Sequence, residues 1–226
     1  YSKKLNRDKT DENRIFTSNE IAEHFKIKDF VINDAESISQ TALGLAIRNT
    51  VSKFEQSASE EIGIEHTYHS SIHTSQSVNP IVDTKLRNLV LGYAKKLWEL
   101  RKDFKSNCLI SHDTYLKLWQ LSNPVLKGYD IIYLDEAQDS NPCLLDIVLK
   151  QQCKIVMVGD GYQSIYAWRG AVNAMSVGVK QWKESLLSTS FRYGKNIAYI
   201  ANCILGISHS SDSKVKGYKE LDNWFT

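Results

Sequence analysis

Two short blocks of polar residues carry the side chains with the clearest chemical potential in this sequence. The first covers residues 135–139 (Asp-Glu-Ala-Gln-Asp) and the second covers residues 158–171. Each block follows a β-branched apolar run, residues 130–134 or 154–158, of the kind that forms a buried parallel strand. Because parallel strands end at a common edge of their sheet, we expect the two blocks to meet there.

The first block places two carboxylates side by side. Adjacent acids at a strand end can divide two tasks: Asp135 can hold Mg²⁺, while Glu136 polarises a water molecule that attacks a phosphate. The alternative is a strand-to-turn junction with two solvated acids, and an isolated Asp-Glu pair favours that alternative. The first block therefore needs support from a second motif.

The second block supplies that support. Gly159 permits a tight exit from the strand, and the amide of Gln163 can contact both a phosphate and an attacking water. Tyr166, Trp168 and Arg169 offer the rings and the guanidinium that stack on single-stranded bases and hold their backbone. Core aromatics and a surface ion pair are the alternative, because buried aromatics are commoner than stacking platforms.

The two blocks resemble motifs II and III of the UvrD-like superfamily 1 DNA helicases. Residues 187–194 (Leu-Ser-Thr-Ser-Phe-Arg-Tyr-Gly) resemble motif IV of that family, and residues 111–121 point to its F-box DNA helicase branch. The resemblance is strongest over residues 108–205, and upstream it is essentially confined to residues 2–6.

The resemblance implies an ATP site with Mg²⁺ as cofactor. Asp135 would be the magnesium ligand and Glu136 the general base toward the hydrolytic water. Gln163 would sense the γ-phosphate and couple it to DNA, and Arg192 would reach the γ-phosphate from a second motor domain. A solvent-facing arginine at a helix N-terminus is the alternative for Arg192.

The resemblance also implies a binding site for single-stranded DNA. Trp168 would stack on a base, with Tyr166 and Arg169 beside it. The implied activity is that of an ATP-dependent helicase that translocates 3′ to 5′ on single-stranded DNA, in DNA repair or recombination. The alternative function is a non-catalytic module, from a degenerate or split helicase, that binds single-stranded DNA or a partner chain.

Part of the family pattern is absent from the sequence. A P-loop requires Gly-x-x-x-x-Gly-Lys-Ser/Thr, and the single Gly-Lys pair, at residues 194–195, lacks both the upstream glycine and the hydroxyl. Motifs V and VI are also missing. We therefore expect an internal segment of a helicase that depends on the remainder of its polypeptide and does not turn over ATP alone.

The predicted fold class is α/β. Residues 1–107 are expected to form a mostly helical insertion subdomain of the first motor domain. Residues 108–185 would form part of that motor domain, a partial RecA-like P-loop NTPase with a parallel sheet. Residues 186–226 would begin a truncated second RecA-like motor domain.

Composition is that of a globular intracellular protein. The 42% of hydrophobic and 24% of charged residues suffice for a sizeable core. No apolar run is long enough to span a bilayer, and the first residues do not form a signal peptide. The four cysteines lack Cys-x-x-Cys spacing, so reduced thiols in the nucleus or cytoplasm are the simplest interpretation.

Several helices are expected from capping signals and apolar spacing. Residues 17–20 (Thr-Ser-Asn-Glu) form a capping box, residues 36–54 suit a longer helix, and Asp113 is the expected N-cap of a helix over residues 115–121. Residues 80–105 predict an amphipathic helix whose outer face carries Lys85, Arg87, Lys95, Lys96, Arg101, Lys102 and Lys105. That face is either simply solvated, which is the commoner case, or a contact surface for DNA phosphates.

Overall fold

The computed structural model describes most of the 226-residue chain, namely residues 15–67, 80–166, 170–172, 174–176, 182–208 and 215–218. Backbone contacts divide the chain into two compact units, Tyr1–Val177 and Gly178–Thr226. Within the described residues, no helix has the length and apolar character needed to cross a membrane.

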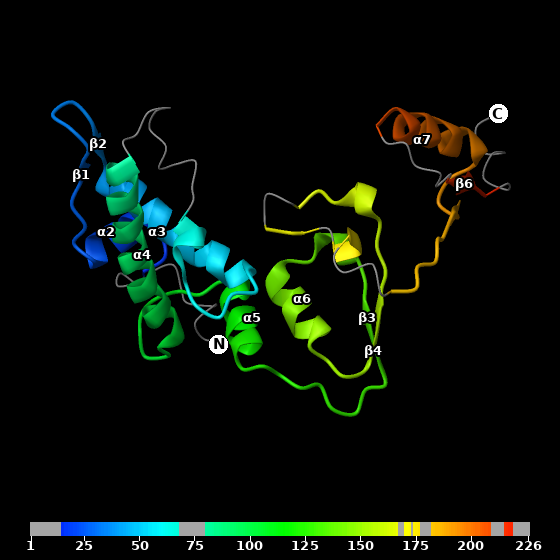
Figure 1. Cartoon of the computed structure of the whole chain (residues 1–226), viewed down its shortest axis with the longest axis horizontal. Helices are drawn as coiled ribbons and strands as arrows, with labels where there is room; N and C mark the ends of the chain where they lie inside the picture. The colour runs from blue at the N-terminus through cyan, green and yellow to red at the C-terminus, as the bar shows by residue number, and fades with distance from the viewer. Residues whose placement is uncertain are drawn as a thin grey trace. The chain divides into compact units, whose positions relative to one another are not determined.

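Residues 15–121 are mainly helical where they are described. In chain order they form α2 (Ser18–His24), β1 (Phe30–Val31), β2 (Ser37–Ile38), α3 (Gln40–Gln56), the 3₁₀ turn η1 (Ile64–Thr67), α4 (Pro80–Lys102) and α5 (His112–Leu121). The two short strands pair antiparallel, and α3 packs against both α2 and α4 (Figure 1). Their facing side chains form one continuous core that includes the fully buried Val51, Phe54, Val90 and Leu97.

The predicted capping box at the start of α2 is confirmed. The Glu20 amide donates to Thr17 Oγ1 at 3.3 Å, and the Thr17 amide donates to Glu20 Oε2 at 2.7 Å. The next helix begins at Gln40 rather than at residue 36, because Ser37 and Ile38 pair with β1. Ser39 then serves as the N-cap of α3.

The expected N-cap of α5 is wrong. Ser111 caps the helix by accepting a bond from the Thr114 amide at 3.3 Å, and the Thr114 hydroxyl accepts one from the Ser111 amide at 3.1 Å. Asp113 lies in the first turn instead, where a carboxylate is stabilised by the helix dipole. The side chain of Asp113 is therefore available for a tertiary contact.

The basic face predicted for residues 80–105 is only partly present. Arg101 is 2% exposed and donates from Nη1 to both carboxylate oxygens of Glu55, at 2.7 and 2.8 Å. Glu55 is itself fully buried and also accepts a bond from the Thr114 hydroxyl at 2.6 Å. Arg101 therefore belongs to the interior, and its placement on the outer face was wrong.

A short parallel contact links the start of the described chain to the exit from α4. Ile15 forms a bridge with Cys108, and its amide donates to Asn107 O at 3.3 Å. The Leu109 amide donates back to Ile15 O at 3.2 Å. Residues 93 positions apart along the sequence are joined in this way.

The rest of the first unit is a strand pair with one covering helix. Its elements are β3 (Ile131–Leu134), η2 (Ala137–Asp139), α6 (Pro142–Leu149), β4 (Lys154–Met157), η3 (Gly161–Gln163) and η5 (Ala174–Ser176). Asn141 caps α6 and Pro142 occupies its first turn, where the N–H that proline lacks would have no partner within the helix. A small second core gathers Ala137, Leu145 and Ala174.

The second unit is small where it is described. It contains β5 (Thr189–Ser190), α7 (Lys195–Ser208) and β6 (Lys216–Gly217), and β5 and β6 are parallel. The Asn202 side chain bonds both the amide and the carbonyl of Val215, each at 2.8 Å. The chain as a whole is thus a mixed α/β protein with short parallel sheets, as expected at that level of detail.

Candidate functional site

The strands β3 and β4 bring the two polar blocks to one edge. They pair in parallel with Ile132 opposite Ile155 and Leu134 opposite Met157, so both strands end at the same side of the pair. Two backbone bonds continue the pairing beyond the strands: the Val158 amide donates to Leu134 O at 2.8 Å, and the Ala137 amide donates to Val158 O at 2.9 Å. The residues that follow each strand are therefore held against one another.

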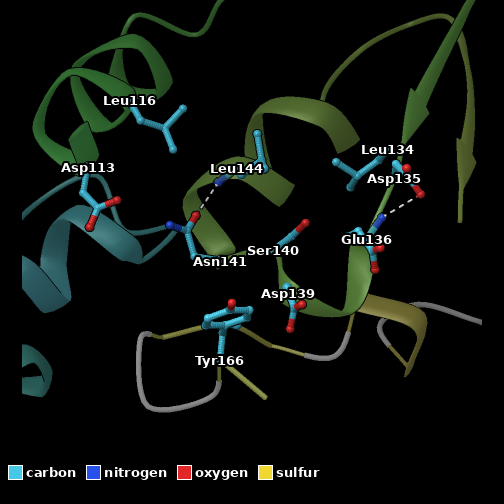
Figure 2. Close-up of a pocket in the computed structure, with 11 residues that line it drawn as sticks. Asp113, Leu116, Leu134, Asp135, Glu136, Asp139, Ser140, Asn141, Leu144 and Tyr166 are labelled. Carbon is cyan, nitrogen blue, oxygen red and sulfur yellow. Dashed lines mark hydrogen bonds between the residues drawn. The ribbon is translucent and has the colours of Figure 1, made fainter. Parts of the chain in front are cut away.

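Glu136 occupies an unusual backbone conformation at this edge. Its φ of 49° lies in the left-handed region, which a non-glycine residue adopts at a penalty of about 1–3 kcal/mol. Its amide donates to Asp135 Oδ1 at 3.0 Å (Figure 2). Its Oε2 accepts a bond from Gln138 Nε2 at 2.7 Å. Both carboxylates are exposed, so the strained turn presents them to solvent side by side.

Gln138 joins the two blocks, a role that its sequence context did not predict. Its side chain is buried, and its Oε1 accepts a bond from the Asp160 amide at 3.1 Å. Its carbonyl accepts a bond from Ser164 Oγ at 3.2 Å. A Cβ on Gly159 would lie 2.4 Å from Gln138 Oε1, so the bridge requires glycine there. The sequence feature that could have indicated this role is the position of Gln138 between the acids Glu136 and Asp139, shortly after a strand.

Gln163 lies in the turn that follows β4. Its Nε2 donates to Asp160 Oδ2 at 2.8 Å, and Asp160 also accepts from the Tyr162 amide with Oδ1 at 3.0 Å. Because the Asp160 amide is bonded to Gln138, Gln163 is linked through two side chains to Glu136. Asp160 is a second residue whose role was not predicted from the sequence.

A cavity of about 380 Å³ lies beside this edge. Its lining includes Asp135, Glu136 and Tyr166, together with Asp113 from the first turn of α5 (Figure 2). The residues that line the cavity come from β3, the turn after it, α5, α6 and the segment after η3. Three of the predicted site residues thus surround one hollow.

Of the other predicted site residues, Gln163 does not line this cavity. Trp168 and Arg169 lie outside the described residues. Arg192 belongs to the second unit, where it is exposed and its amide donates to Ser190 Oγ at 3.3 Å. Its proposed contact with a γ-phosphate stays a prediction.

The interior behind the cavity is polar. The amine of Lys117 in α5 is fully buried and donates to the carbonyls of Ser57 and Ser59, at 3.0 Å for Ser57. Burial lowers the pKa of Lys117 to about 8, although the nearby Cys143, Asp146 and Glu55 partly oppose the shift. Burial also raises the pKa of the Cys143 thiol to about 11.

The residues at the strand ends suit a magnesium ion. Mg²⁺ prefers oxygen ligands and usually keeps several waters, so one or two exposed carboxylates are enough on the protein side. Asp135 and Glu136 provide carboxylate oxygens alone, without sulfur or imidazole competitors, at an exposed edge. Among the described residues, no three His, Cys, Asp or Glu side chains gather into a metal cluster, as a structural metal site would need.

Comparison with protein families identifies the class. The model of the UvrD/REP helicase N-terminal domain matches residues 2–181, and the chain belongs to this family. The predicted resemblance is thereby confirmed, and it extends well upstream of the region where the motifs were strongest.

Individual relatives refine this assignment. F-box DNA helicase 1 of Gallus gallus is 38% identical over 85% of this chain, and F-box DNA helicase protein 1 of Schizosaccharomyces pombe is 33% identical over 82%. The ATP-dependent DNA helicase PcrA of Staphylococcus epidermidis is 33% identical over 39% of the chain. This chain spans about a fifth of the length of the two F-box relatives. No solved structure matches it.

Proposed function

We propose that this chain is the part of an ATP-dependent DNA helicase that couples the hydrolytic edge of the first motor domain to single-stranded DNA. The observation that carries the proposal is the bonded series from Glu136 through Gln138 and Asp160 to Gln163. It connects a candidate hydrolytic acid to a candidate phosphate-sensing amide across two adjacent strands. The names of the F-box DNA helicase relatives support the same activity.

In the proposed mechanism, Asp135 and Glu136 have separate tasks. Asp135 would hold Mg²⁺, which when bound neutralises the charge on the nucleotide phosphates. Glu136 would accept a proton from the attacking water, and the bond from Gln138 Nε2 orients its carboxylate for that step.

Gln163 is proposed to report the state of the nucleotide to the DNA-binding residues. Its Nε2 donates to Asp160 Oδ2 at 2.8 Å, and because an NH2 group carries two donors, the same nitrogen would also bond a γ-phosphate oxygen. A shift of Gln163 toward the phosphate would then alter the segment that leads to Tyr166. Tyr166, Trp168 and Arg169 are proposed to grip single-stranded DNA through stacking and charge.

We propose that β3 and β4 belong to a RecA-like motor domain over residues 108–185, with an insertion subdomain at 1–107 and a second motor domain from residue 186. Arg192 would act from that second domain on the γ-phosphate. The intact helicase is proposed to translocate 3′ to 5′ on single-stranded DNA and to act in DNA repair or recombination.

The test is single-stranded-DNA-stimulated ATPase activity, measured on this chain and on a version extended at both ends in its reading frame. We expect activity only in the extended protein, because the 226 residues contain no Gly-x-x-x-x-Gly-Lys-Ser/Thr run. Glu136→Gln should abolish that activity, whereas Glu99→Gln on the exposed face of α4 should leave it intact. Absence of ATPase activity in the extended protein would contradict the proposal and favour a module that binds single-stranded DNA or a partner chain without hydrolysing ATP.

A further inference from the structure

The last residue of α3 reaches from the helical core to the candidate site. Gln56 Nε2 donates to Asp113 Oδ2 at 3.0 Å, a bond between residues 57 positions apart. Asp113 lines the same cavity as Asp135 and Tyr166. None of the roles proposed above requires a bond from α3 to this carboxylate.

The other end of the same amide lies against a glycine of the second polar block. A Cβ placed on Gly170 would lie 2.5 Å from Gln56 Oε1 and 3.3 Å from Gln56 Cβ. Gly170 also has a φ of 79°, a conformation that a side chain would strain. Gln56 thus packs directly on the backbone of Gly170, and glycine is the residue that permits both the approach and the turn.

Backbone bonds carry this contact onward to Tyr166. The Ala171 amide donates to Tyr166 O at 3.3 Å, and the Val172 amide donates to Ser140 O at 3.0 Å. The residue after Gly170 is therefore tied to Tyr166, and the next one is tied to the loop after β3. A displacement of Gly170 would be transmitted to Tyr166 through a single backbone bond.

We propose that Gln56 is a positioning residue for the nucleic-acid contact: it seats Gly170 and Asp113 so that Tyr166 is presented at the edge of the cavity. The inference rests on the proposed role of Tyr166 in binding single-stranded DNA. Helix α3, whose other residues pack in the helical core, therefore also sets the affinity of the neighbouring site for single-stranded DNA. Gln56 itself touches neither the nucleotide nor the DNA.

The first test exchanges the donor and acceptor roles of residues 56 and 113. Binding of fluorescently labelled oligo(dT) to the 226-residue chain is measured by anisotropy at one fixed salt concentration. Gln56→Glu places two carboxylates in contact, and we expect about ten-fold weaker binding, equivalent to about 1.4 kcal/mol. Adding Asp113→Asn restores a donor opposite the new carboxylate and should recover the affinity.

A matched control exists in the same helix. Gln40→Glu makes the same substitution in the first turn of α3, about 24 Å away along the helix axis. It should leave the affinity within a factor of about two. Failure of Asp113→Asn to rescue Gln56→Glu, with both proteins folded by urea titration, would overturn the proposal.

The second test asks whether Gln56 acts through Tyr166. Loss of a stacked aromatic should weaken oligo(dT) binding by Tyr166→Ala about ten-fold. Gln56→Ala should weaken it less, and the double variant should bind no more weakly than Tyr166→Ala alone, because non-additivity marks residues that act together. A merely structural role for Gln56 would instead make the two losses add, which would overturn the proposal.

The outcomes separate the inference from the function on which it rests. If the wild-type chain does not bind oligo(dT), or if Tyr166→Ala binds as tightly as the wild type, the proposed DNA-binding function of this site is wrong. If Tyr166→Ala weakens binding while Gln56→Ala does not, only the positioning role of Gln56 is wrong.

Discussion

The helical part of the first unit and its strand pair bury their apolar side chains to very different extents. Val51, Val90 and Leu97 of the helical core are fully buried. In contrast, Tyr133 of β3 is 68% exposed and Ile131 is 39% exposed. A parallel strand pair with one covering helix leaves its second face open, whereas helices α2, α3 and α4 close a core among themselves. The candidate chemistry lies on the less buried region, and α3 and α5 of the helical region contact its helix α6.

The largest expected effect comes from the buried ion pair of the helical region. Glu55→Gln would leave Arg101 charged in the interior without a carboxylate, which should lower the free energy of unfolding by about 3–5 kcal/mol. Urea denaturation measures the change. Glu99→Gln is the matched control, because Glu99 pairs with Lys102 at the surface and should contribute less than about 1 kcal/mol. Equal losses for the two variants would contradict the contrast.

A second pair of variants compares the two regions directly. Leu97→Ala removes a fully buried side chain and should lower the free energy of unfolding by about 2–5 kcal/mol. Tyr133→Ala removes a mostly exposed ring and should change it by less than about 0.5 kcal/mol. Thermal or urea unfolding of both variants checks the difference. A loss for Tyr133→Ala as large as that for Leu97→Ala would show that the face of β3 is covered in solution.

A pH titration examines the polar interior where the two regions meet. Burial lowers the pKa of Lys117 from 10.5 to about 8, so above pH 8 the folded chain releases a proton that the unfolded chain still binds. Unfolding free energy should therefore rise with pH, by about 1 kcal/mol between pH 8 and 9 relative to Lys117→Met. Above pH 9 the raised pKa of Cys143 acts in the opposite direction. A flat difference between pH 8 and 9 would be inconsistent with this assignment.

The smallest expected effect concerns the outer face of α4. Three of the seven cations predicted for residues 80–105 form ion pairs: Arg101 with Glu55, Arg87 with Asp83 at 2.7 Å and Lys102 with Glu99 at 2.8 Å. We therefore expect Lys85→Glu together with Lys95→Glu to change the slope of log affinity against log salt by less than about 1.

Oligo(dT) binding across a salt series provides the measurement for that prediction. Arg169→Ala, in the second polar block, is the comparison and should reduce the slope by about 1, because one phosphate contact is lost. A larger reduction for the α4 variant than for Arg169→Ala would instead assign α4 to the DNA interface.

Sequence patterns were sufficient for local features but not for contacts between distant residues. The strands around Ile132 and Ile155 follow from β-branched runs, and the structure confirms their parallel pairing. Their predicted burial is wrong, because Ile131, Tyr133 and Val156 are exposed. Arg101 was misplaced because helical spacing shows only which residues share a face, and its partner Glu55 lies 46 positions earlier.

The same limit applies to the candidate site. Asp135 and Glu136 are visible as a motif because they are adjacent. Gln138, Asp160 and Gln56 acquire their roles only through bonds made across strands and helices, at separations of 22 residues for Gln138 to Asp160 and 57 residues for Gln56 to Asp113. No alternation or capping rule encodes such distances. Supporting residues of this kind can therefore be identified only from the three-dimensional structure.

The bridge between Ile15 and Cys108 also constrains the order in which the chain folds during synthesis. Its partners are 93 residues apart, so Ile15 cannot reach its final neighbour until all of α4 has left the ribosome. At about 5–20 residues per second, that interval lasts roughly 5–20 seconds. During this interval, the segment around Ile15 lacks the partner that it later has at Cys108, which gives chaperones time to bind it.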